Sequence, residues 1–295
     1  MSRTLIRSKV GISLPRKRKR YRTISKKKLL ELKPFLDELV NKIEQADYIH
    51  DDPVQFMHAF DDKNDQELAG FFAATMAWGR RDIVNAKVED LLNRMNNRPV
   101  EFIKNYKESD ASNFKGFKHR TFKPIDIHWI TKTLQSILLK FGDFENFWAF
   151  CRDKAKQERR DLIPVFHEQF FTFHPEIPQR VRKHVSNPEK NSSAKRLYMY
   201  LRWVIRNDSP VDPGTMSFIA PSELKIPLDV HVGRQARKLG LLSRKQNDWK
   251  AVIELTRRMK VLDPEDPAKY DYALFGIGVL GSDIPEELII NKRVE

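Results

Sequence analysis

One stretch of the sequence decides the fold class: SAKRLYMYLRWVIR, from Ser193 to Arg206. Its apolar side chains recur every three or four residues, so Leu197, Leu201 and Val204 fall on one side of a helix. The same spacing recurs along most of the chain, and the alternating patterns typical of strands are nearly absent. We therefore predict an all-α fold, a helical bundle without a βαβ unit or an internal repeat.

Helical spacing predicts further helices on both sides of this stretch. Together with it, they cover residues 25–46, 65–78, 81–96, 125–141, 143–157, 160–172, 193–206, 229–239, 247–260 and 267–278. Ser25 suits the N-cap of the first helix, and Gly79 and Gly240 suit the C-terminal ends of two others. The polar stretches 50–63 and 107–123 predict loops. Because no clear linker divides the pattern, we expect one domain or two interleaved helical halves.

Length and composition narrow the possible classes of protein. Of the 295 residues, 40% are hydrophobic and 11% aromatic, which allows a substantial core and excludes global disorder. The sequence contains no run of about 18 apolar residues that could cross a membrane. The basic N-terminus lacks the apolar run of a secretory signal, so we expect a cytoplasmic protein. Cys151 is the single cysteine, which excludes a disulfide framework, a cysteine-rich zinc site and a four-cysteine iron–sulfur cluster.

Positive charge is concentrated in two segments. The chain has 54 Lys and Arg and 40 Asp and Glu, a net charge of +14, and residues 1–30 hold 12 of the basic residues and no acidic one. We expect a disordered basic tail over 1–24, a helical body over 25–285 and a C-terminal tail over 286–295. Within the body, residues 178–260 contain 18 basic and 7 acidic residues. Such a segment is typical of phosphate-backbone binding, although ordinary exposed lysines give the same count.

The first candidate for chemistry lies at the start of the helix quoted above. Ser192 or Ser193 can cap this helix, whose free N–H groups then form a site for a DNA phosphate. Lys195 falls in the first turn, where the helix dipole favours an uncharged amine that can act as a nucleophile. Arg202 and Arg206 lie on the same face. Composition alone favours a simpler interpretation, a surface lysine on a basic helix.

The second candidate is Asp229, which opens a helix directly after a proline-containing loop. It lies in the run Ile226-Pro227-Leu228-Asp229-Val230-His231-Val232-Gly233-Arg234. Because aspartate is a favoured N-cap, capping is its simplest role. His231 is by itself more typical of a hydrogen-bonded structural histidine than of a metal ligand.

The run around Asp229, followed by Leu239-Gly240-Leu241, resembles the catalytic-aspartate segment of the helix-hairpin-helix DNA glycosylases, which include endonuclease III. Lys195, early in a helix and 34 residues before Asp229, resembles the lysine of the archaeal 8-oxoguanine glycosylases. The hairpin signature of endonuclease III, Leu-Pro-x-Val-Gly, is missing before Lys195. The glycosylase resemblance therefore covers only about 190–242.

A second resemblance covers about 30–285, to an uncharacterised bacterial family known as a domain of unknown function. The segments that carry it are Glu67-Leu68-Ala69-Gly70 through Trp78-Gly79-Arg80, Ser193-Ala194-Lys195-Arg196, Leu201-Arg202-Trp203, Pro227-Leu228-Asp229 and Tyr270-Asp271-Tyr272-Ala273-Leu274-Phe275-Gly276.

The glycosylase resemblance implies a helix-hairpin-helix glycosylase-like bundle that excises a damaged or modified base from double-stranded DNA. Residues 178–260 would be the catalytic and DNA-binding segment, with Lys195 and Asp229 as the catalytic residues. The expected DNA contacts are Ser192, Ser193, Arg196, Arg202, Arg206, His231 and Arg234. A flipped base needs an aromatic wall, for which the candidates are Trp203, Tyr198 and Trp78, with Phe275 and Trp249 also available.

Two residues suffice for this chemistry. Breaking the bond between base and sugar builds positive charge on the sugar, which a fixed carboxylate stabilises. If water attacks, the product is an abasic site; if the Lys195 amine attacks, a Schiff base forms and strand cleavage can follow, an AP-lyase activity. The resemblance implies an oxidised purine as substrate. A hypermodified base, including one from phage DNA, is equally open, as is the choice between DNA and RNA.

Two other functions remain open. The basic tail and basic segment also fit a non-catalytic nucleic-acid-binding helical protein. A metal-dependent phosphohydrolase or nuclease would draw its ligands from His50-Asp51-Asp52, His58 and Asp61-Asp62, whose spacing matches no known ligand set. We expect no metal, no cofactor and a monomer.

Overall fold

The computed structural model describes residues 20–294, and the regular secondary structure of these residues is helical. Within these residues the only β-type pairing is an isolated bridge between His119 and Phe122. The prediction of an all-α fold is therefore confirmed. The basic run Arg16–Lys19, part of the expected tail, lies outside the described residues.

The helices follow the predicted order. The α-helices are α1 Lys26–Ile43, α2 Gln55–His58, α3 Lys63–Met76, α4 Arg81–Arg94, α5 Pro99–Lys104, α6 Pro124–Phe141, α7 Phe144–Glu158, α8 Leu162–Phe170, α9 Gln179–Arg182, α10 Lys195–Ile205, α11 Val230–Lys238, α12 Trp249–Leu262 and α13 Tyr270–Val279. Short 3-10 helices span Ala46–Asp51 (η1), Glu108–Phe114 (η2), Pro188–Lys190 (η3), Pro221–Glu223 (η4), Pro267–Lys269 (η5) and Glu286–Leu288 (η6). Every predicted helix is present to within a few residues. The polar stretches predicted as loops hold α2, part of η1 and η2.

Local signals explain where several helices begin and end. The Ser25 hydroxyl accepts a hydrogen bond from the Lys28 N–H at 3.3 Å, which confirms the predicted cap of α1. Gly240 follows α11 with a φ of +68°, as expected for a C-terminal glycine. Gly79 does not end α3, because that helix stops at Met76. Instead, its φ of +122° lets the chain turn sharply into α4.

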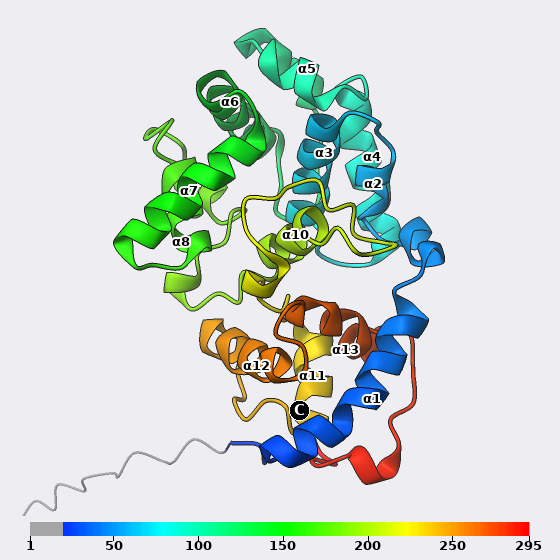
Figure 1. Ribbon diagram of the computed structural model, residues 1–295. Helices are drawn as coiled ribbons and strands as arrows, with labels where there is room; N and C mark the ends of the chain where they lie inside the picture. The colour runs from blue at the N-terminus through cyan, green and yellow to red at the C-terminus, as the bar shows by residue number, and fades with distance from the viewer. Residues whose placement is uncertain (1–19, 295) are drawn as a thin grey trace, which may run out of the picture.

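The helices form two halves that share one hydrophobic core (Figure 1). The middle of the chain, α2 to α10, makes the upper half of the view, and both ends, α1 and α11 to α13, make the lower half. In the lower half α13 contacts both α1 and α11, and in the upper half α10 contacts α3. One domain with interleaved halves therefore describes the fold, with α10 at the boundary between them.

Both ends of the described chain attach to the C-terminal end of α11. The Ile24 N–H donates to the Gly240 carbonyl at 3.1 Å, and the Ile290 N–H donates to the Lys238 carbonyl at 2.8 Å. Residues 20–24 and 286–294 therefore belong to the folded body, which is longer at both ends than the predicted 25–285.

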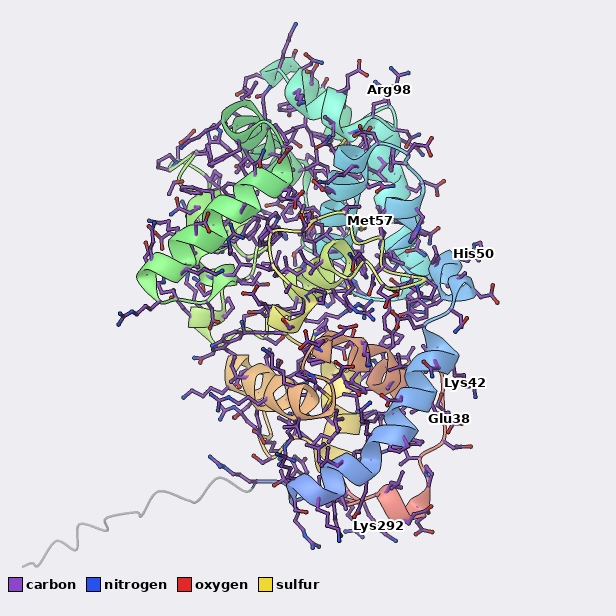
Figure 2. All side chains as sticks on the ribbon, in the orientation of Figure 1. Glu38, Lys42, His50, Met57, Arg98 and Lys292 are labelled. Atoms are coloured by element: carbon purple, nitrogen blue, oxygen red, sulfur yellow. The ribbon has the colours of Figure 1, made fainter. Side chains whose placement is uncertain are left out.

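Side chains sort by the amphipathic pattern that predicted the helices (Figure 2). Met57 is buried in the interior, whereas Glu38 and Lys42 extend from the outer side of α1. Aromatic rings fill the upper half, where Trp148 stacks on Phe166 with the ring centroids 3.7 Å apart. No helix within residues 20–294 is long and apolar enough to span a membrane.

Candidate active site

Lys195 is the first residue of α10, and the turn before it is unusual. Ala194 occupies the N-cap position with a φ of +47°, in the left-handed region that alanine rarely adopts. The Ser192 hydroxyl accepts a hydrogen bond from the Ala194 N–H at 3.1 Å. The predicted capping by Ser192 or Ser193 is therefore wrong, because the helix begins at Lys195. The hydrogen bond of Ser192 instead stabilises the turn that precedes the helix.

Asp229 caps α11 and faces Lys195 at the same time. Its Oδ1 accepts a hydrogen bond from the Val232 N–H at 2.9 Å, and its Oδ2 lies 3.9 Å from the Lys195 ammonium. The side chains of Lys195 and Asp229 are 27% and 21% exposed, so both are accessible from solvent. The Asn247 amide holds the Asp229 carbonyl at 2.8 Å and so fixes the first turn of α11. Two helix N-termini thus bring together the two residues singled out in the sequence.

The pair lies in a cavity of about 430 Å³ between the two halves of the fold. Its walls come from α10, α11 and α13 on one side, and from η1 and the turn between α3 and α4 on the other. The lining side chains that matter for chemistry are Lys195, Met199, Arg202, Asp229, His231, Asp271, Phe275, Tyr48, Asp52, Arg80 and Arg81. This volume is in the range of small-molecule sites and is adequate for one nucleoside.

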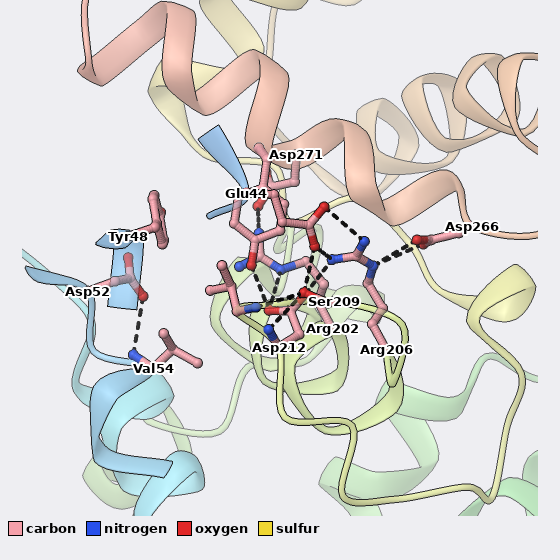
Figure 3. Close-up of polar contacts among 12 residues, drawn as sticks. Glu44, Tyr48, Asp52, Val54, Arg202, Arg206, Ser209, Asp212, Asp266 and Asp271 are labelled. Carbon is pink, nitrogen blue, oxygen red and sulfur yellow. Dashed lines mark hydrogen bonds and ion pairs between the residues drawn. The ribbon is translucent and has the colours of Figure 1, made fainter. Parts of the chain in front are cut away.

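Two further ion pairs line the cavity, and Figure 3 shows the one between Arg202 and Asp271. Arg81 lies 3.1 Å from Asp52, and its guanidinium covers the rings of Tyr48 and Phe275 at 5.2 and 4.8 Å from the ring centroids. On the α10 side, Arg202 donates to Asp271 Oδ2 at 2.5 Å.

Asp271 and Asp52 are the most buried acids of the cavity, each 7% exposed. Burial raises the pKa of Asp271 to about 7, with Arg202 opposing this effect and the nearby Asp229 adding to it.

Arg202 and Arg206 are buried and not exposed to a DNA duplex, contrary to the prediction. Each is 3% exposed. Arg206 forms ion pairs with Glu44 and Asp212 at 2.5 Å and with Asp266 at 2.9 Å (Figure 3). Their charges are therefore satisfied inside the protein, where they join α1, α10 and α13.

The other residues predicted to contact phosphate differ in how exposed they are. The Arg196 guanidinium is partly buried and donates to the Thr75 carbonyl at the end of α3. It therefore stabilises the C-terminal end of that helix. His231 and Arg234 are exposed on α11, and His231 also lines the cavity. Ser193 is partly buried in the turn before α10.

The predicted aromatic wall is wrong in two of its three members. Trp203 is fully buried in the core, and Tyr198 is 3% exposed and stacks on Trp249 instead. Trp78 is 52% exposed, and Ala77 and Gly79 beside it line the cavity. Trp78 therefore lies at the margin of the cavity. The aromatic surfaces of the cavity itself come from Tyr48 and Phe275.

Three of the residues proposed as metal ligands, Asp52, His58 and Asp62, have structural partners instead. Asp62 caps α3 through the N–H groups of Asn64 and Asp65, and His58 Nε2 lies 2.8 Å from the Val211 carbonyl oxygen. Among the described residues, no group of three His, Cys, Asp or Glu is placed to hold a metal ion.

The cavity residues that the sequence did not single out include Tyr48, Arg81 and Asp271, and Asp52 was considered only as a metal ligand. Asp271 carried a usable signal, because it is the only charged residue in the otherwise apolar helix YDYALFGIGV. A lone acid in such a helix indicates a paired or functional group. Asp52 and Tyr48 lie in a short irregular segment with no periodic pattern to orient them.

The chain belongs to the family described as Protein of unknown function (DUF2400), whose model matches residues 52–280. No curated protein and no solved structure matches the chain. The expected membership of a domain-of-unknown-function family is therefore confirmed, and the resemblance to glycosylases stays a prediction.

Proposed function

We propose that this member of the DUF2400 family is a DNA glycosylase that uses Lys195 and Asp229. One observation carries the proposal. Lys195 Nζ and Asp229 Oδ2 lie 3.9 Å apart in a cavity of about 430 Å³, although their residues are far apart in the chain. An amine and a carboxylate at this distance can exchange a proton after a small movement, because catalytic contacts often tighten only when substrate binds.

The two side chains divide the reaction between them. As the bond between base and sugar breaks, the Asp229 carboxylate stabilises the positive charge on the sugar. The Lys195 ammonium gives a proton to Asp229, and the resulting amine attacks the anomeric carbon as the base leaves. In the adduct, a proton moves from the Lys195 nitrogen to the ring oxygen of the sugar, the bond between that oxygen and the anomeric carbon breaks, and the Schiff base that forms supports strand cleavage.

The rest of the cavity suits a flipped base. Tyr48 and Phe275 offer aromatic surfaces of the kind against which bases stack. Outside the cavity, Trp78 and the exposed Arg80 and Arg234 are the side chains we assign to the duplex, in place of the buried Arg202 and Arg206. The substrate is an oxidised purine or a hypermodified base.

Borohydride trapping tests the proposal without knowledge of the base. The protein is mixed with a duplex that carries one abasic site, borohydride is added, and covalent adducts are resolved on a denaturing gel. We expect an adduct that Lys195→Gln abolishes and Asp229→Asn weakens. Lys190→Gln is the matched control, because Lys190 is exposed on η3 and does not line the cavity.

Two outcomes would contradict the proposal. An adduct that survives Lys195→Gln would place the reactive amine elsewhere. If no adduct forms and no modified base is released from duplex DNA, the protein is a non-catalytic nucleic-acid binder. In that case Asp229→Asn should leave binding unchanged or strengthen it.

A further inference from the structure

Asp271 lies in the same cavity as Lys195 and Asp229 but has no role in the reaction proposed for that pair. It is the second residue of α13, and its side chain is 9% exposed, compared with 21% for Asp229 and 27% for Lys195. Side-chain exposure falls from Lys195 through Asp229 to Asp271, so we place Asp271 deepest of the three in the cavity. A flipped nucleotide enters base first, so its sugar lies near Lys195 and Asp229 and its base lies near Asp271.

The contacts of Asp271 leave one of its oxygens for a ligand. Oδ2 accepts the hydrogen bond from Arg202 at 2.5 Å. Arg202 has other partners as well: Asp212 Oδ1 lies 3.4 Å from its Nε, and the Tyr272 ring centroid lies 4.1 Å from its guanidinium carbon. If Oδ1 carries a proton, Oδ2 remains an acceptor and Arg202 keeps its hydrogen bond.

We infer that Asp271 is the catalytic acid that protonates the departing base, an inference that rests on the proposed glycosylase function. The bond between the anomeric carbon and the base nitrogen breaks, and its electron pair goes to the base. The proton on Asp271 Oδ1 moves to a ring nitrogen of the base. The Lys195 ammonium passes a proton to Asp229, and its nitrogen then forms the new bond to the anomeric carbon, while Asp271 becomes a carboxylate held by Arg202.

The charges around Asp271 suit this role. Arg202 and Lys195 face it from α10, Asp229 from α11, and Asp212 from the loop after α10. Burial and the two carboxylates favour the protonated acid, the two cations favour the carboxylate, and the resulting pKa of Asp271 is about 7. Two carboxyl groups with different environments can thus act as acid and as charge stabiliser in one site.

The inference specifies the substrate class. A neutral purine leaves as an unstable anion unless it is protonated, so it needs Asp271. An N7-methylated purine is already cationic and leaves as a neutral base without a proton donor. Comparing the release of the two kinds of base therefore tells whether Asp271 donates a proton or only maintains the structure.

The test compares release of 8-oxoguanine and hypoxanthine with release of N7-methylguanine, each from the same duplex. Asp271→Asn should slow release of the neutral bases about 100-fold or more, in the range of general acid catalysis. It should slow release of N7-methylguanine far less. Asp82→Asn is the matched control, because Asp82 lines the same cavity but pairs with Arg80 at 2.6 Å and not with Arg202. It should affect all three bases alike.

The pH dependence of the wild-type protein gives a second measurement if Asp271→Asn does not fold. Release of a neutral base should fall above about pH 7, and release of N7-methylguanine should not fall in parallel. Equal losses for all bases in Asp271→Asn, parallel pH profiles, or no release of either neutral purine by the wild type would overturn the inference. Failure of Lys195-dependent trapping would instead overturn the proposed function.

Discussion

Replacing Arg206 by methionine should destabilise the fold severely without weakening contacts to DNA. The guanidinium of Arg206 is 3% exposed and pairs with Glu44, Asp212 and Asp266 at 2.5 to 2.9 Å. Methionine fills a similar volume but leaves three carboxylates without their common cation. Removing one partner of a buried ion pair costs about 3–5 kcal/mol. We expect a loss of this size, because the same side chain joins α1, α10 and α13.

Urea denaturation followed by far-UV circular dichroism measures this loss. With a slope of about 3 kcal/mol per molar urea, the midpoint should fall by about 1–2 M. Arg234→Met is the control. Since Arg234 is exposed on α11, its loss should leave the midpoint unchanged and should reduce the salt dependence of DNA binding by about one phosphate contact. If Arg206→Met instead keeps the wild-type midpoint and reduces that salt dependence, Arg206 binds phosphate and the buried network does not exist in solution.

Two further stability predictions follow from local geometry. Burial acts to raise the pKa of Asp126, but the His184 ring, 3.5 Å away, and two hydrogen bonds from Arg180 outweigh it and lower the pKa to about 2. The ionised form is therefore favoured in the folded state, so about 2 kcal/mol is present above about pH 4 and is lost as the pH falls toward 2. Urea titrations should show Asp126→Asn more destabilising at pH 7 than at pH 3, by about 1 kcal/mol. Gly214→Ala should lower the urea midpoint more than Gly116→Ala. Both glycines have positive φ, but an added Cβ at Gly214 would lie 2.4 Å from the Asn207 Cα, whereas at Gly116 it meets no atom within 4 Å. Equal midpoints for the two variants would contradict this reasoning.

The sequence predicted the long helices because each has a periodic apolar face. Residues 125–141 were predicted and α6 covers Pro124–Phe141, because its buried face is continuous. α5, Pro99–Lys104, is too short to show a period. The start of α10 was misplaced by two residues, because a left-handed alanine is not a signal that a sequence pattern contains.

The prediction for Arg202 and Arg206 failed for a different reason. Both arginines were correctly placed on the helix face that carries Lys195, and Arg202 lines the cavity with it. The partners that bury them are distant in the chain: Asp271 is 69 residues from Arg202, and Glu44 is 162 residues from Arg206. A count of charges along residues 178–260 cannot detect such partners. The count for residues 178–260 therefore overstates the positive charge at the surface, because the charges of Arg202 and Arg206 are neutralised internally.

Asp229 can cap a helix and take part in catalysis at the same time, although the sequence presented these as alternative roles. Its two oxygens do different things: Oδ1 accepts the capping hydrogen bond from the Val232 N–H, and Oδ2 faces Lys195. Asparagine caps a helix about as well as aspartate, because its carbonyl oxygen can replace Oδ1. It has no negative charge, however, and cannot take a proton from Lys195. Asp229→Asn therefore impairs the chemistry and keeps the cap, so weaker trapping in this variant at an unchanged urea midpoint can be assigned to the reaction and not to the fold.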